Sequence, residues 1–97
     1  RSDRLLFTAR ADRPMRLSVQ LREPAGEADH RWQRSVYLDT EPREITVYFD
    51  DVRPIGMTPR DLPALANVDA ILFVVDTVNT PLGGSGRIWI DDVRYAR

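Results

Sequence analysis

Hydrophobic residues alternate with polar residues along most of this chain, and this two-residue period is the feature that most restricts its fold. Successive side chains of a β-strand point to opposite faces of a sheet, so an alternating segment buries one face and exposes the other. The segment from Met15 to Arg22 shows the pattern most clearly. Its apolar positions are Met15, Leu17, Val19 and Leu21, and the polar positions between them are Arg16, Ser18, Gln20 and Arg22. Helical periodicity is nearly absent, so the sequence predicts an all-β fold.

The alternating segments and the turn residues between them predict about six strands. The predicted strands are Leu5 to Ala11, Met15 to Arg22, Trp32 to Leu38, Glu44 to Phe49, Ala70 to Asp76 and Arg87 to Tyr95. The first two are expected to form a hairpin, because only Asp12-Arg13-Pro14 connects them. The polar segment Glu23 to Arg31 is expected to be a loop. The nearly continuous apolar run from Ala70 is typical of a central strand that is covered on both faces.

These strands predict an antiparallel β-sandwich, and their number fits only part of a jelly roll, which has about eight strands. A sandwich that is short of strands has an open edge, and an open edge can pair with another chain. We therefore expect either that strands lie outside this chain or that a partner chain completes the sandwich.

Two segments depart from regular alternation. Asp50 to Asp69 carries three prolines and no sustained pattern, so we expect a long crossover at one end of the sandwich, with room for one helical turn. In the last strand, Ile88 and Ile90 share one face, whereas Val93 and Tyr95 fall on the other. A β-bulge at Asp91-Asp92 would return all four side chains to the core side.

Composition limits the classes of function. The 97 residues fit one domain spanning positions 1–97, and the first residue, Arg1, suggests a piece of a longer chain. The absence of cysteine excludes disulfides, thiolate metal sites and cysteine catalysis. The net charge of −1 argues against nucleic acid as a partner. No apolar run approaches the roughly 20 residues of a membrane span, so no membrane partner is predicted.

The residues that could support catalysis are badly placed for it. Glycosidases use two carboxylates that flank one bond, but neighbouring strand residues such as Asp91 and Asp92 point to opposite faces. The same objection applies to Asp50 and Asp51. His30 is the only histidine, and its polar surroundings offer no nucleophile or oxyanion hole. The sequence therefore predicts a protein that is not an enzyme.

The polar face of the second to fourth strands is the best candidate binding surface. Its predicted ligand-binding residues are Arg16, Ser18, Gln20, Tyr37 and Tyr48. Aromatic rings can stack on the flat faces of sugars, and arginine and amide groups can take paired hydroxyls. Asp76 is a further candidate, either as a hydroxyl acceptor at the rim or as an Asx-turn residue. The alternative is that this face is simply hydrated. Trp32 and Trp89 are each either stacking platforms or core residues.

Four segments together resemble a known family. They are DRPMRLSVQLR, RWQRSVYLD, REITVYFDDVRPIG and LFVVDTVNTPLGGSGRIWIDDV. In this order they resemble the C-terminal part of galactose-binding-like β-sandwich modules, most closely carbohydrate-binding modules of family eleven and their relatives. The resemblance runs from about Leu5 to Tyr95, and its last segment is the most specific. The N-terminal strands that complete the family's jelly roll are missing from this chain.

The resemblance implies a non-catalytic module that docks a polysaccharide or oligosaccharide on a concave sheet face. It also implies an extracellular or periplasmic location and attachment to a glycoside hydrolase in the parent chain. Asp91 matches an aspartate of the family's closing strand that can join a structural calcium site, although it could equally bond its own backbone. The alternative function is a structural module that forms a homodimer through its exposed strand edge, without binding sugar.

Overall fold

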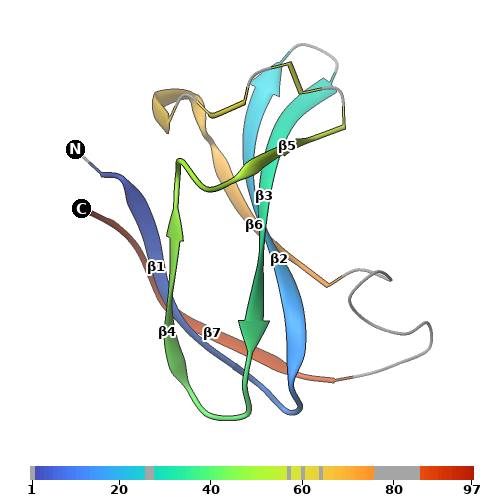
Figure 1. Cartoon of the computed structure of the whole chain (residues 1–97), viewed down its shortest axis with the longest axis vertical. Helices are drawn as coiled ribbons and strands as arrows, with labels where there is room; N and C mark the ends of the chain where they lie inside the picture. Colours follow the sequence, from blue (N-terminus) through green and yellow to red (C-terminus); the bar gives the residue numbers. More distant parts are fainter. Residues whose placement is uncertain (1, 26–27, 57, 60, 64, 76–85) are drawn as a thin grey trace.

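The chain folds into two antiparallel β-sheets that pack face to face (Figure 1). A computed structural model describes residues 2–25, 28–56, 58–59, 61–63, 65–75 and 86–97. One sheet has the order β4-β1-β7, and the other has the order β5-β3-β2-β6. The strands are β1 (Arg4–Ala11), β2 (Met15–Ala25), β3 (Ala28–Leu38), β4 (Arg43–Tyr48), β5 (Arg53–Ile55), β6 (Ala70–Val74) and β7 (Ile88–Ala96). A single 3-10 turn, η1 (Leu65–Asn67), is the only helix in the described segments, and it is far too short to cross a bilayer. The prediction of an antiparallel β-sandwich is confirmed.

The core forms where the alternating faces of β1 and β2 meet. All four apolar residues of β1 on this face are at most 2% exposed: Leu5, Phe7, Ala9 and Ala11. Leu17, Val19 and Leu21 of β2 are each 1% exposed. The ring of Phe7 contacts the ring of Phe73 in β6 edge to face, with centroids 5.2 Å apart, and so links the two sheets. Burial of a large apolar side chain stabilises a fold by roughly 1.5–3 kcal/mol, so this interface supplies most of the stability.

The first two strands do not form a hairpin, and that prediction is wrong. β1 pairs with β4 and β7 in one sheet, whereas β2 pairs with β3 and β6 in the other. The turn at residues 12–14 therefore carries the chain from one sheet to the other, and the apolar faces of β1 and β2 meet across the core. The alternating pattern requires only that the apolar face of each strand be buried. Packing β1 and β2 across the core buries both faces as well as pairing them side by side would.

The true hairpin joins β2 and β3, and it is longer than the sequence suggested. Its ladder runs from Met15 opposite Leu38 to Ala25 opposite Ala28. The segment predicted as a loop thus contributes to both strands, with Glu23 opposite His30. Polar composition favoured a loop, but the regular backbone pairing of the hairpin continues through these polar residues.

A bulge is present in β7 as predicted, but at Asp92 and Val93 and not at Asp91-Asp92. Leu6 pairs with Arg94 and Thr8 pairs with Asp91, so two residues of β7 lie opposite the single residue Phe7. Asp92 has a φ of 55°, the left-handed conformation in which Asp is tolerated better than most residues. The extra residue changes the side-chain parity, and Tyr95 pairs with Leu5 on the core side.

The predicted crossover contains a short strand. β5 pairs with β3 at one edge of the four-stranded sheet, and the chain then reaches β6 at the opposite edge. β6 is consequently an edge strand and not the central strand that its apolar run suggested. All five of its side chains are half-buried, since the strand is covered only in part.

Candidate functional site

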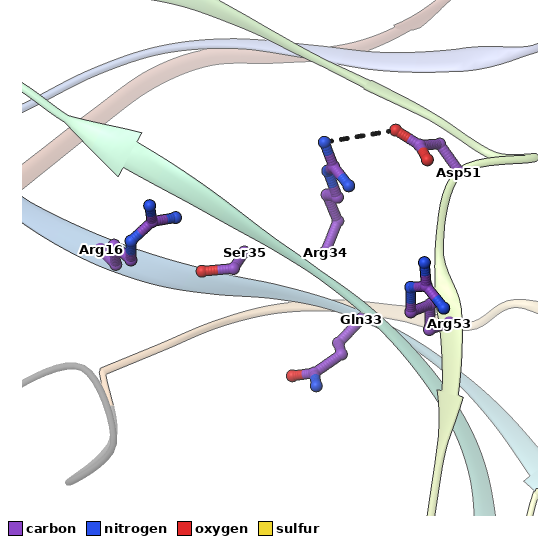
Figure 2. Close-up of a pocket in the computed structure, with 6 residues that line it drawn as sticks. All are labelled: Arg16, Gln33, Arg34, Ser35, Asp51 and Arg53. Carbon is purple, nitrogen blue, oxygen red and sulfur yellow. Dashed lines mark ion pairs between the residues drawn. The ribbon is translucent and has the colours of Figure 1, made fainter.

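The outer face of the four-stranded sheet has a hollow of about 300 Å³ at the free edge of β3 (Figure 2). We call it the arginine hollow. It is lined by Arg16, Gln33, Arg34, Ser35, Asp51 and Arg53. Three of these six residues are cations and one is an anion, so the lining is positive in a chain whose net charge is −1.

Strand register brings these side chains together. Gln33 lies directly opposite Arg53, so both side chains project from the same face. Arg16 lies opposite Tyr37, and the next cross-strand pair on the same face is Ser18 and Ser35. The pairing of β5 with β3 does not extend past Gln33, which lies opposite Arg53. The edge of β3 beside Ser35 is therefore not covered by β5, and this leaves a notch.

Arg34 reaches the hollow from the other face of β3. It lies opposite Val19, which is a core residue, so strand parity directs Arg34 toward the interior. Because β5 has ended at this point, the Arg34 side chain is 48% exposed and pairs with Asp51 at 3.5 Å. Arg34 is therefore accessible to solvent because it lies at an edge of the sheet, although strand parity directs it inward.

Side chains of β2 and β3 form a chain of hydrogen bonds on the outer face, which we call the relay. Arg31 Nη1 donates to Gln20 Oε1 at 3.5 Å, and Gln20 Nε2 donates to Ser18 Oγ at 3.3 Å. Ser18 Oγ in turn donates to Gln33 Oε1 at 2.8 Å. Arginine has no acceptor, so Arg31 fixes which end of the Gln20 amide faces it, and the Gln20 amide nitrogen then faces Ser18. The Ser18 hydroxyl proton finds its acceptor in Gln33 Oε1.

The relay determines what Gln33 offers to a ligand. Its Oε1 is occupied by Ser18, and no described residue bonds its Nε2. The amide therefore keeps two N–H donors that no described residue accepts. Arg16 and Arg53 contribute only donors as well.

The structure brings together some of the predicted ligand-binding residues and separates others. Arg16 and Tyr37 are exposed on the same face. Ser18 and Gln20 also belong to this face, but at 1% and 8% exposure they are buried and act through Gln33. Asp76 lies outside the described residues.

Tyr48 does not share this face, and its grouping with Arg16 and Tyr37 is wrong. It belongs to β4 of the three-stranded sheet, where it pairs with Arg4. The Arg4 guanidinium lies 4.9 Å from the Tyr48 ring centroid. Alternation correctly placed Tyr48 on the outer side of its own strand, but it could not assign that strand to a sheet.

The two tryptophans have different environments. Trp32 is 0% exposed and belongs to the core, so it is not a stacking platform for a ligand. Trp89 is 40% exposed on the outer face of the other sheet, and the Arg10 guanidinium lies 3.8 Å from its ring centroid. Its accessible ring is thus already stacked on an arginine.

Asp91 bonds the backbone of the next residue. Its Oδ1 accepts the N–H of Asp92 at 2.8 Å, which supports the bulge. The described segments contain no group of three or more acidic or histidine side chains suited to a metal ion. A calcium role for Asp91 stays a prediction.

Sequence reasoning identified Arg16 as a binding residue and missed the other five residues that line the arginine hollow. Gln33 and Ser35 share the parity of Tyr37, and this was the available indication that they face outward. Arg53 was missed because β5 is only three residues long, and Arg34 because its parity points inward.

Comparison with known proteins adds no relative: no family model, no curated protein and no solved structure matches the chain. The resemblance to carbohydrate-binding modules therefore depends on the sequence segments, and the function has to be argued from the site.

Proposed function

We propose that this domain is a non-catalytic carbohydrate-binding module that docks a glycan on the outer face of the four-stranded sheet. The observation that carries the proposal is the arginine hollow beside an exposed tyrosine. Tyr37 is 56% exposed and is the direct cross-strand partner of Arg16. A flat ring and a forked donor thus lie side by side, which suits the apolar face and the polar edge of a sugar.

The arrangement supports docking and not turnover. The hollow offers guanidinium and amide donors, and its one carboxylate, Asp51, is paired with Arg34. An open sheet face buries little of a glycan, so we propose reversible binding of modest affinity to a polysaccharide or oligosaccharide. The family resemblance further supports a parent chain with a glycoside hydrolase and an extracellular or periplasmic location.

The tyrosines on the two faces provide a test. Tyr37→Ala should lower glycan affinity by about two- to tenfold, because aromatic stacking contributes roughly 0.5–1.5 kcal/mol. Tyr48→Ala is the matched control, since it removes an exposed ring from the opposite sheet. Retardation in native gels that contain polysaccharides measures both variants. Equal retardation of wild type and Tyr37→Ala would place the ligand elsewhere.

A second candidate function is assembly through the free edge of β7. Val93 and Tyr95 are 45% and 52% exposed, although the bulge places Tyr95 on the core side. Together with Leu5, Ile71 and Arg94 they line an apolar hollow of about 220 Å³. In the described part of the chain, β7 is the last strand of its sheet. An unpaired edge beside an apolar hollow favours addition of a strand from a second copy.

This candidate predicts a dimer whose population rises with protein concentration. Val93→Arg should convert it to a monomer, because a charge would have to be buried in the new contact. Light scattering after size exclusion measures the mass of both proteins. A wild-type monomer at every concentration tested would exclude this function and leave glycan docking unaffected.

A further inference from the structure

The charge and the hydrogen-bonding capacity of the arginine hollow indicate the class of its ligand. We propose that the hollow binds an anionic oxygen group, a carboxylate or a sulfate, carried on the glycan. This inference rests on the proposed function and restricts it to acidic saccharides.

The first argument is the pairing of arginines across the protein. Five strand arginines form ion pairs with carboxylates of other residues, in addition to Arg34: Arg4, Arg22, Arg31, Arg43 and Arg94. Arg10 stacks on Trp89. Arg16 and Arg53 are the exceptions, since no carboxylate or ring of the described residues lies within contact distance of either guanidinium. Both exceptions line the same hollow.

Electrostatics then favours an anion between them. Three guanidinium groups around one cavity repel one another, and Asp51 offsets only one of those charges. Figure 2 shows Arg16 and Arg53 on either side of the β3 segment that carries Gln33 and Ser35. An anionic group seated over that segment would be approached by a guanidinium from each side. Charge-assisted bonds of this kind are stronger than bonds between neutral groups.

The second argument is that donors predominate among the groups that line the hollow. The relay through Ser18 occupies Gln33 Oε1, so Gln33 offers N–H groups, as do both arginines. Ser35 Oγ and the Asp51 carboxylate are the acceptors among the lining residues, and Asp51 is already paired with Arg34. A sugar hydroxyl both donates and accepts, so it would use these donors less fully than an anion. A carboxylate or a sulfate only accepts, so it matches a set of donors.

The backbone adds one more donor. The N–H of Arg31 donates to Thr58 Oγ1 at 2.8 Å, on the β5 side of β3. Every second residue of an antiparallel strand directs its N–H to the same side, and the ladder to β2 is regular over this stretch. The N–H of Ser35 therefore faces the notch beyond the end of β5.

The test compares glycans that differ only in charge. Wild-type protein is run in gels that contain polygalacturonate or its methyl ester, and dextran sulfate or dextran. In at least one of the two pairs, we expect the acidic glycan to bind the protein at least about tenfold more tightly than the neutral glycan does. This difference corresponds to one or two charge-assisted hydrogen bonds. The carboxylate pair and the sulfate pair distinguish the two sources of the anionic group.

The double variant Arg16→Gln/Arg53→Gln should abolish that preference, with folding checked by circular dichroism. The double variant Arg4→Gln/Arg10→Gln is the matched control, because it removes two charges from the outer face of the opposite sheet. Equal losses in both variants would reveal nonspecific attraction and overturn the inference. Equal retention by neutral and acidic members would overturn the inference while supporting glycan docking. No retention by any of the four would overturn both.

Discussion

Trp32→Ala should destabilise the domain by about 3–5 kcal/mol, the range measured when large aromatic residues are removed from protein cores. Trp32 is 0% exposed and is the largest fully buried side chain of the described residues. It lies opposite Leu21 in β2, so its loss would leave a cavity under the central hairpin. Small domains have a total stability of roughly 5–15 kcal/mol, so this change removes a large share of it. Urea denaturation followed by far-ultraviolet circular dichroism measures the change.

Trp89→Ala is the control for this prediction. Trp89 is 40% exposed, and its main described contact is the stacked Arg10. An exposed cation–π pair contributes about 0.5–1 kcal/mol, so the loss of stability should be several times smaller than for Trp32. Similar losses in the two variants would contradict the assignment of Trp32 to the core.

The two tryptophans illustrate what sequence alone could predict. Alternation assigned the faces of β1 and β2 correctly, as the burial of Leu5, Phe7 and Val19 confirms. It also located the bulge in β7, because a bulge is a local change of parity. Trp32 remained ambiguous because it was placed at the start of a strand beside a loop, whereas β3 begins four residues earlier at Ala28. The hairpin ladder that buries it depends on pairing with β2, which polar composition did not reveal.

Assignment of strands to sheets was beyond the reach of alternation. A strand with one apolar face is equally satisfied beside its neighbour or across the core from it. This is why β1 and β2 were expected to pair and instead face each other. It is also why Tyr37 and Tyr48, both correctly predicted to point outward, lie on opposite sides of the sandwich.

Most of the arginine hollow escaped prediction for a related reason. Arg16 has outward parity in a long, regular strand, so its position followed from the pattern. Arg53 belongs to a strand of three residues, which is too short to show a period. Arg34 is accessible only because that short strand ends beside it, so its exposure results from pairing between distant segments.

Ser18→Ala should destabilise the domain by about 1–3 kcal/mol, more than the loss of a single hydroxyl suggests. Ser18 is 1% exposed, and its Oγ accepts from Gln20 Nε2 and donates to Gln33 Oε1. Removing that oxygen leaves a donor and an acceptor without their partner, in the buried part of the relay. Ser35 lies directly opposite Ser18 but is exposed, so Ser35→Ala should change the free energy of unfolding by no more than about 0.5 kcal/mol.

A double-mutant cycle separates the hydrogen bond from simple packing. If Ser18 stabilises the fold through Gln33, then Ser18→Ala and Gln33→Ala together should cost less than the sum of the single changes, with a coupling of about 0.5–3 kcal/mol. Denaturant titration of the four proteins gives this value. Additive losses would mean that the relay does not hold Gln33 in place. The Gln33 amide would then be free to turn its oxygen outward, and the arginine hollow would lose two of its donors.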